Sequence, residues 1–285
     1  MLYYYAFTSH KIGLDRVKKA AAILKGLEAK GIESRLLVND FRAGLVAREF
    51  GVNDSINIET IQDIDAIAEM GNVVIIDSPE DDKGRLQKYC TEFKQVFRFA
   101  QNSDDSSRFG EIMFKYDCDG EDCISALIVD DIYFEPKDKE ERTLFFLNDS
   151  DYDKVILNNK DLFVDKGLEL LLGNYFFVKY EDDLKELFSI LYEPEDYIDL
   201  IRSSSHIITA SFQTALEAKV SAAEVSFINL LNAPNEELQI LENYGIKTIE
   251  TIENANNDKT KSLKSLKPLK PMLTKTIEAI LSKSK

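Results

Sequence analysis

The chain has no long apolar run and little cysteine. No stretch of its 285 residues approaches the roughly 20 consecutive apolar residues that a membrane helix needs. The start of the sequence, Met1–Thr8, lacks the basic flank and long apolar region of a signal peptide, so we expect a cytoplasmic protein without a membrane span. Cys90, Cys118 and Cys123 are too few and too odd in number for a disulfide framework, and we interpret them as buried or idle thiols.

Positive charge is also scarce. Lysine and arginine number 35 against 51 aspartates and glutamates, which gives a formal net charge of -16. This charge repels nucleic acid and anionic lipid, so we expect neither as a partner. The sequence lacks the Gly-x-Ser-x-Gly turn of serine hydrolases and the dinucleotide fingerprint, and we expect no cofactor and no metal. A phosphate-bearing ligand would have to be held locally, by backbone N–H groups at a helix N-terminus.

Predicted strands and helices alternate along the first half of the chain. Apolar residues recur on one face between residues 15 and 30, which is typical of a helix that Gly31 then ends. Strands that alternate with helices favour a parallel, doubly wound sheet. We expect strands at residues 2–7, 34–38, 72–77, 95–99, 111–116 and 124–129, and helices at residues 15–30, 44–50, 61–70 and 81–89.

The second half repeats this alternation, so the predicted fold class is α/β with two Rossmann-like, doubly wound domains. The charged, proline-containing stretch 134–142 is the predicted linker. We place the domains at 1–136 and 143–258, followed by a connection and closing helix at 259–285. Such sheets bind ligands beyond the carboxyl ends of their strands, so we expect the site in an inter-domain cleft. The predicted strands are 143–147, 175–178, 189–192, 206–210 and 224–230, and the helices 151–165, 181–188, 194–202, 213–220, 235–243 and 271–282.

One stretch resembles a known superfamily. Residues 200–218 indicate a helix, a buried strand and a turn of small residues into a helix that carries Thr214 and Glu217. This stretch resembles the sugar-nucleotide corner of GT-B proteins. The resemblance implies that Glu217, in a Thr-x-x-Glu-Ala run, lies near the ribose hydroxyls, and that N–H groups of the turn hold the diphosphate. Ser211 and Phe212 stand where the superfamily usually has glycines, which adds side chains where a phosphate would approach.

Most of the chain is also similar to the UDP-sugar hydrolase family of pseudaminic acid biosynthesis. Residues 11–16 correspond to that family's Ile-Gly-x-Gly-His loop, and residues 74–77, 126–134 and 188–217 follow its order of segments. The resemblance implies a UDP-amino-sugar hydrolase-like protein of bacterial surface or flagellar glycan biosynthesis, with a nucleotide-sugar as its small-molecule partner.

The sequence departs from that family at the residues that would do the chemistry. The family's catalytic histidine falls at Arg16, and an upstream arginine and aspartate fall at Tyr5 and Phe7. The family's glycine-rich loop is here residues 147–152, whose two aspartates would repel a diphosphate. Hydrolysis needs a base or a positioned charge. Arg16 supplies only the charge, and His10 is the candidate substitute base.

The predicted site combines two segments of the chain. We assign His10 and Arg16 to catalysis, and we expect Lys11 and Arg16 to neutralise phosphate. Asp77 is included because it follows a buried strand, although acids in such a loop also cap the next helix. The alternative is that Thr214 caps or lines an ordinary helix and that Glu217 lies on a solvated face. The residues predicted to bind substrate are Lys11, Gly13, Asp77, Ser211, Gln213, Thr214 and Glu217.

Two other functions stay open at this point. The combined loss of the histidine, the glycines and the aspartate favours a non-catalytic module that binds a sugar-nucleotide or a protein partner. A glycosyltransferase is the other alternative, because the same cleft supports transfer. Residues 117–122 alternate acids around a glycine in the manner of a calcium loop, but they lack its spacing and terminal glutamate, so we expect a solvated hairpin turn.

Overall fold

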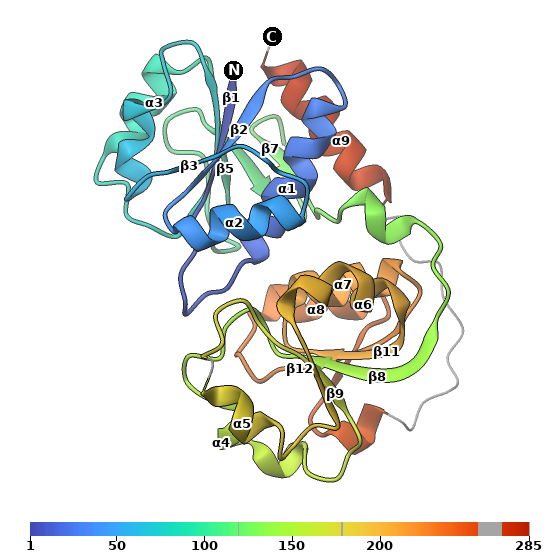
Figure 1. The fold of residues 1–285 in the computed structure, drawn as a ribbon. Helices are drawn as coiled ribbons and strands as arrows, with labels where there is room; N and C mark the ends of the chain where they lie inside the picture. The colour runs from blue at the N-terminus through green and yellow to red at the C-terminus, as the bar shows by residue number, and fades with distance from the viewer. Residues whose placement is uncertain (119, 178, 256–269, 285) are drawn as a thin grey trace. The chain divides into compact units, whose positions relative to one another are not determined.

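The computed structural model describes residues 1–118, 120–177, 179–255 and 270–284 (Figure 1). The chain divides into two compact units. The first comprises Met1–Ser9, Leu14–Asp130 and Pro268–Lys285, and the second comprises His10–Gly13 and Asp131–Lys267. The predicted connection at residues 259–267 lies outside the described residues. Each unit has a parallel sheet with helices between its strands, so the predicted α/β class is confirmed.

The first unit is built on a sheet with the strand order β3-β2-β1-β4-β5-β6-β7, in which every described pair of neighbours is parallel. The chain leaves β1 toward one edge and later returns on its other side at β4, so β1 and β4 flank the topological switch point. The strands are β1 (Leu2–Ala6), β2 (Ser34–Val38), β3 (Ser55–Asn57), β4 (Val73–Asp77), β5 (Gln95–Phe99), β6 (Ile112–Lys115) and β7 (Cys123–Ser125). The helices of this unit are α1 (Asp15–Glu28), α2 (Phe41–Glu49), α3 (Arg85–Glu92), α9 (Lys270–Lys283) and the 3-10 helix η1 (Ile61–Ala66). The next 3-10 helix, η2 (Asp131–Phe134), begins the second unit's main segment.

The second unit repeats this topology, with the parallel strand order β10-β9-β8-β11-β12-β13 and its switch point between β8 and β11. The strands are β8 (Glu140–Phe146), β9 (Glu169–Leu171), β10 (Ile190–Tyr192), β11 (Ser204–Thr209), β12 (Glu224–Ile228) and β13 (Lys247–Ile249). The helices are α4 (Val155–Asn158), α5 (Tyr180–Leu184), α6 (Tyr197–Ser203), α7 (Phe212–Val220), α8 (Asn235–Asn243) and the 3-10 helices η3 (Lys160–Leu162), η4 (Pro194–Asp196) and η5 (Ile252–Ala255).

Alternation along each strand divides the side chains between the two faces of the sheet. On β1, Tyr3 and Tyr5 join a core cluster with Ile64 of η1 and Tyr89 of α3. Tyr4, between them, points to the opposite face, where α1 lies. Burial of such a side chain stabilises the fold by roughly 1.5–3 kcal/mol relative to leaving it exposed.

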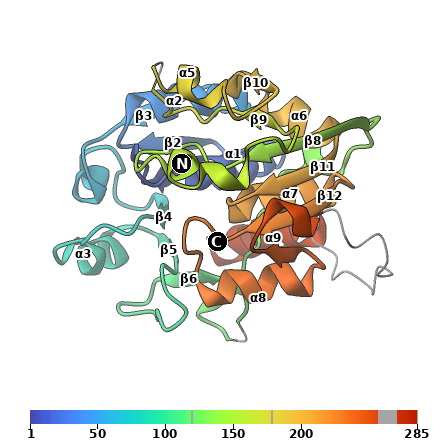
Figure 2. The same ribbon diagram turned by 90° about the horizontal axis from the view of Figure 1, so that it is seen from below.

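Helix α1 packs through one apolar face, as its periodicity predicts. Its buried residues include Val17, Ala21 and Leu24, and Gly31 follows the helix with a φ of +75°, a left-handed conformation that favours glycine. Figures 1 and 2 show α9 beside α1. A Cβ atom built on Gly26 of α1 would lie 2.1 Å from Cδ1 of Ile277, so the close approach of these helices depends on the missing side chain.

The predicted hairpin at residues 117–122 is wrong. Strands β6 and β7 are parallel, with Met113 opposite Cys123. A hairpin turn joins antiparallel strands, so the connection between β6 and β7 is a crossover to the same end of the sheet. The interpretation of all three cysteines as idle thiols is also wrong, because Cys118 and Cys123 form a disulfide with Cα atoms 6.4 Å apart. Cys90 remains a thiol, and burial, followed by the nearby Glu111 carboxylate, raises its pKa to about 11.

Two predictions in the second unit also fail. Residues 175–177 are not a strand. The strand that pairs with β8 on the side away from β11 is β9, whose Leu170 and Leu171 are fully buried. The helix predicted at 151–165 is reduced to α4 and η3. Lys154 and Asp165 have φ values of 52° and 58°, and these left-handed residues bound the helical segment at either end.

Candidate functional site

In the first unit, an ion-pair cluster around a buried carboxylate lies at the switch point. Asp77, the last residue of β4, is 1% exposed. Its Oδ1 is 3.1 Å from Nε of Arg16 and its Oδ2 is 2.7 Å from Nζ of Lys19, both on α1. The Tyr4 hydroxyl donates to Oδ2 at 3.3 Å, and Arg16 Nη2 donates to Oε1 of Gln101 at 2.7 Å. Asp77 therefore holds two cations of α1 against the carboxyl edge of the sheet.

In this cluster the nearby charges affect the pKa of Asp77 more strongly than its burial does. Burial alone would raise the pKa of Asp77, but the Lys19 ammonium and the Arg16 guanidinium hold it below its ordinary value. Burial, followed by the Asp77 charge, raises the pKa of Tyr4 well above its ordinary value. Asp77 is thus ionised and Tyr4 neutral at physiological pH.

A further acid of the loop after β4 lies on the other face of the sheet. Glu80 Oε2 accepts hydrogen bonds from the hydroxyls of Tyr5 at 2.6 Å and Ser78 at 2.9 Å, and from the backbone N–H of Ile61 at 3.2 Å. Tyr5 and Tyr4 are adjacent in β1 and point to opposite faces. Glu80 therefore anchors its own loop and η1.

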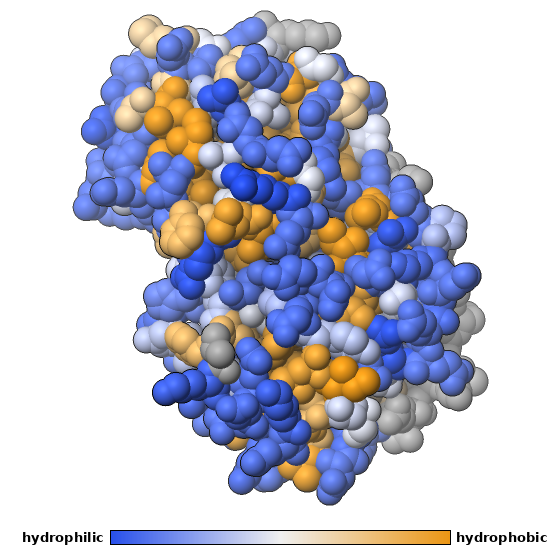
Figure 3. Space-filling view, in the orientation of Figure 1, coloured by the Kyte–Doolittle hydropathy of each residue, from blue (hydrophilic) through white to orange (hydrophobic). Residues whose placement is uncertain are grey.

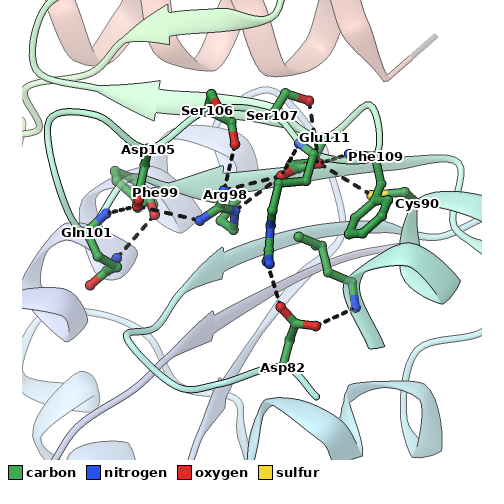
Figure 4. Close-up of polar contacts among 12 residues, drawn as sticks. Asp82, Cys90, Arg98, Phe99, Gln101, Asp105, Ser106, Ser107, Phe109 and Glu111 are labelled. Atoms are coloured by element: carbon green, nitrogen blue, oxygen red, sulfur yellow. Dashed lines mark hydrogen bonds and ion pairs between the residues drawn. The ribbon is translucent and has the colours of Figure 1, made fainter. Parts of the chain in front are cut away.

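Figure 4 shows another polar cluster of the first unit, centred on Glu111. This side chain is fully buried and accepts backbone N–H groups of Arg108 at 3.1 Å and Phe109 at 2.9 Å, while Nη2 of Arg98 lies 3.3 Å from Oε1. Arg98 also lies 3.6 Å from Asp105, in the loop between β5 and β6. Every one of these contacts fixes the loop between β5 and β6, so the cluster has a structural role.

In the second unit, the segment His10–Gly13 packs on the loop that follows β8. The Ser150 hydroxyl donates to the backbone oxygen of His10. The His10 and Tyr152 rings are 5.0 Å apart between centroids, and Nζ of Lys11 lies 4.6 Å from the Tyr152 centroid. Gly13 has a φ of +83°, and a Cβ there would lie 2.5 Å from Oδ1 of Asn148.

The two aspartates of the loop after β8 have buried carboxylates. Asp151 is 4% exposed and accepts the backbone N–H groups of Val155 at 2.5 Å and Ile156 at 3.2 Å, together with the Tyr180 hydroxyl. Asp149 is 1% exposed, and its Oδ1 accepts from the side-chain amide of Asn174 at 3.2 Å. Burial raises the pKa of Asp151 despite the hydrogen bonds from Tyr180 and the start of α4. These aspartates fix the local backbone and are not displayed at the surface as charges.

Helix α7 starts directly after β11, on the second strand of this switch point. Ser211 is its N-cap, and its hydroxyl oxygen accepts the Thr214 N–H at 3.1 Å. The Ser211 N–H in turn donates to Oγ1 of Thr209 at 3.0 Å. The side chain that replaces a glycine of the superfamily pattern is therefore turned back into the helix cap.

Glu217 lies in a buried network of neutral groups one turn further along α7. It is 1% exposed, its Oε2 accepts from the Tyr197 hydroxyl at 2.6 Å, and its Oε1 accepts from the Gln213 amide at 2.8 Å. The Tyr197 hydroxyl also contacts Oγ1 of Thr214 at 2.7 Å. Burial, followed by the Glu217 charge, raises the pKa of Tyr197 well above its ordinary value. The alternative of a solvated helix face is wrong for Glu217.

The surface of the described residues is largely hydrophilic in the view of Figure 3, with apolar residues in patches between the polar ones. None of the helices in the described part of the chain is long and apolar enough to cross a bilayer. Within the same residues, no three or more histidine, cysteine, aspartate or glutamate side chains are arranged to hold a metal ion.

Comparison with known proteins identifies the fold of the chain. No protein-family model matches the sequence, and no curated protein is similar to it. UDP-GlcNAc 2-epimerase from Methanocaldococcus jannaschii matches with a TM-score of 0.57 and 13% identity over 99% of this chain and 99% of that chain. A glycosyltransferase from Rickettsia africae ESF-5 matches with a TM-score of 0.55 and 11% identity over 100% of this chain and 94% of that chain. UDP-GlcNAc 2-epimerase from Neisseria meningitidis, bound to UDP-GlcNAc, matches with a TM-score of 0.55 and 12% identity over 99% of this chain and 100% of that chain.

The chain has a two-domain, Rossmann-like GT-B fold. The predicted fold class is therefore confirmed. The narrower resemblance to the pseudaminic acid hydrolases remains a prediction.

Within the GT-B fold, the predicted site residues fall into three groups. Arg16 and Asp77 contact each other in the first unit. The start of α7 brings together four of the predicted residues, and the segment His10–Gly13 brings together three on the loop after β8. The four residues at α7 are Ser211, Gln213, Thr214 and Glu217.

Three residues that the sequence interpretation missed complete these groups. Lys19 is three residues after Arg16, and this helical spacing was a usable signal. Tyr197 and Tyr152 contact the predicted residues only through tertiary packing, which no spacing in the sequence indicates.

Proposed function

We propose that this protein is a cytoplasmic GT-B-like protein that binds a nucleotide-sugar of the UDP-amino-sugar class and does not hydrolyse it. The observation that supports binding is the position of Ser211–Glu217 at the carboxyl end of β11, beside the switch point of the second unit. Ligands of doubly wound sheets bind at such points, and a helix N-terminus there favours phosphate. The Ser211 hydroxyl caps α7 at that position.

Arg16 supports the absence of hydrolysis. It stands where the resemblance puts a catalytic histidine, and an arginine side chain stays protonated in proteins and cannot accept a proton from water. Its guanidinium is also engaged by Asp77 and Gln101. An Arg16 held in this way supplies charge and not base catalysis.

Calorimetry with UDP and UDP-GlcNAc tests the binding proposal. The matched variants are Ser211→Asp and Ser211→Asn, which have nearly the same shape and both cap helices well. Only the aspartate adds a negative charge where the diphosphate would approach, so we expect Ser211→Asp to bind UDP about tenfold more weakly than Ser211→Asn. No binding heat with the wild-type protein at millimolar UDP or UDP-GlcNAc would sink the proposal and leave a protein-interaction module.

A UDP-amino-sugar hydrolase is the second candidate, and the position of His10 favours it. His10 is exposed and its ring contacts Tyr152 on the loop after β8, in the unit proposed to bind the nucleotide. As a base it would take a proton from the attacking water. That activity would belong to bacterial surface or flagellar glycan biosynthesis, as the family resemblance implies.

Measurement of free sugar separates these functions. Binding of UDP-GlcNAc or a UDP-diacetamido sugar without sugar release supports the non-catalytic protein. Sugar release in water that His10→Gln abolishes, with binding retained, would establish the hydrolase instead. Release that requires an added glycan acceptor would identify a glycosyltransferase, whereas release in water alone counts against transfer.

A further inference from the structure

Two basic side chains of the first unit converge at the carboxyl edge of its sheet. Arg16 and Lys19 are three residues apart on α1 and therefore share a helix face. Both reach Asp77 at the end of β4, and the Lys19 ammonium also lies 4.5 Å from the centroid of the Phe99 ring. The cluster lies at the β1–β4 switch point, where doubly wound sheets bind ligands.

The ion pairs of this cluster leave a local excess of positive charge. Arg16 and Lys19 share the single carboxylate of Asp77, so these three side chains together have one net positive charge. This excess occurs in a chain with a formal net charge of -16. The neighbouring polar groups, Tyr4 and Gln101, add no charge.

Two other carboxylates near these strands, those of Glu111 and Glu80, lie on the opposite face of the sheet. Arg98 and Phe99 are adjacent in β5 and point to opposite faces. Glu111, which lies on Arg98 in the cluster of Figure 4, is therefore on the other face from Lys19 and Phe99. Glu80 is on that other face too, bonded to Tyr5. Asp105 lies 3.6 Å from Arg98 and also accepts the backbone N–H of Gln101 at 2.8 Å. Neither Glu111 nor Glu80 cancels the positive charge on the α1 face, and the Asp105 carboxylate is engaged by Arg98 and by the Gln101 N–H.

Both cations remain accessible. The side chains of Arg16 and Lys19 are 19% and 18% exposed, whereas Asp77 is 1% exposed. The hydrogen bonds of Arg16 to Asp77 and Gln101 use Nε and Nη2, and a guanidinium has more N–H donors than these two bonds use. An incoming anion would thus meet donors and not the buried carboxylate.

The geometry points to an anion-binding site in the first unit, in which Arg16 and Lys19 bind a phosphate or carboxylate group and Asp77 positions them. The shared chemistry is a compact oxyanion, supplied either by a phosphorylated ligand or by an acidic sugar. This site goes beyond the proposed nucleotide binding by the second unit and does not depend on it.

The test is calorimetry of the full chain at low ionic strength, with inorganic pyrophosphate and glucuronate as separate probes. We expect saturable binding of at least one of them that weakens as sodium chloride is added. Lys19→Met retains an apolar side chain on Phe99 but removes the ammonium, and we expect it to bind about tenfold more weakly. The matched control is Lys25→Met, on the same helix and ion-paired to Asp130, and we expect it to bind like the wild type.

Asp77→Asn separates ligand binding from a purely structural cluster. Removal of the internal counter-charge should leave the affinity for the probe equal or higher, provided that a thermal melt shows a folded protein. If the cluster only stabilised the fold, Asp77→Asn would bind no better than Lys19→Met. If Asp77→Asn fails to fold, the difference in affinity between Lys19→Met and Lys25→Met still tests whether the cluster binds the anion.

Three outcomes would overturn the inference. The first is the absence of saturable binding heat with either probe at millimolar concentration. The second is an equal loss of affinity in Lys19→Met and Lys25→Met. The third is a loss of affinity for the probe in Ser211→Asp but not in Lys19→Met. The last result would locate the anion in the second unit and leave the nucleotide proposal standing. Preference for pyrophosphate or for glucuronate identifies the source of the oxyanion.

Discussion

Asp77 in the first unit and Glu217 in the second are both buried carboxylates near the carboxyl ends of central strands, but they have different partners. Asp77 is bonded to the charged groups of Arg16 and Lys19. Glu217 is bonded to the neutral groups of Tyr197 and Gln213. The second sheet repeats the order of the first six strands of the first sheet, and the two sheets stabilise a buried acid in two ways.

The difference has electrostatic consequences. Cations compensate the burial of Asp77 and hold its pKa below the ordinary value, with positive charge left over. In the second unit, burial, followed by the Glu217 charge, raises the pKa of Tyr197. The shared topology therefore sets where a buried acid lies, while the residues of the neighbouring helix set its charge environment.

The largest effect is expected from Asp77→Ala. Removal of this carboxylate leaves two cations facing each other and should lower the free energy of unfolding by about 3 kcal/mol. Asp54→Ala is the matched control, because its ion pair with Arg35 is exposed, and it should cost less than about 1 kcal/mol. Urea denaturation of both variants measures the difference. Similar small losses would mean that the Asp77 cluster contributes no more than a surface ion pair.

The pH dependence of stability sharpens the same contrast. The folded-state pKa of Asp77 is below its unfolded value, so its stabilisation is present above the unfolded pKa and is lost as the pH falls through the folded pKa. The loss should therefore begin below about pH 4. Asp77→Asn should flatten this acid limb in denaturation curves recorded at a series of pH values. An unchanged acid limb would contradict the lowered pKa.

Glu217→Gln is expected to have the next largest effect. The glutamine keeps one oxygen that can accept from Gln213, but its amide then faces Tyr197, whose hydroxyl must reverse its hydrogen bond toward Thr214. The hydrogen bond from Tyr197 to the carboxylate is lost, at a cost of about 2 kcal/mol. The exposed Glu195→Gln should change the free energy of unfolding by less than about 0.5 kcal/mol. Equal stability of the two variants in urea would show that the Glu217 network tolerates rearrangement.

The smallest effect concerns the segment His10–Gly13, which belongs to the second unit although α1 follows it. Gly13→Ala should cost about 1 kcal/mol because of its positive φ, and more because its Cβ displaces Asn148. Gly31→Ala is the matched control. Gly31 has a similar φ of +75°, and no atom lies within 4 Å of where its Cβ would be, so this variant measures the backbone cost alone. Thermal melts compare the two, and an equal loss would mean that Asn148 moves freely.

The sequence predicted the elements whose patterns are long and regular. Helix α1 and strand β4 have the predicted positions within a few residues, because periodicity and continuous apolar runs follow from burial. Strands β9 and β13 are only three residues long, and too few residues alternate to form a pattern. The parallel return between β6 and β7 could not be predicted, because short connections usually form hairpins.

The candidate site was predictable to a smaller extent. Ser211, Thr214 and Glu217 were found because a short motif fixes their spacing on one helix. The same motif could not show that Glu217 is buried, because Tyr197 comes from the preceding helix and meets it only after folding. Similarly, Asp77 was identified from its place after a strand, but its partners depend on the rotation of α1 about its own axis.

The packing of α9 on α1 has a consequence for synthesis of the chain. The first unit contains both the earliest strand, β1, and the latest helix, α9, with Ile277 seated over Gly26. A ribosome therefore releases every strand of the second unit before it releases the helix that covers α1. During translation the face of α1 around Gly26 therefore stays uncovered until α9 has been synthesised, and transiently exposed apolar surface of this kind is prone to aggregate.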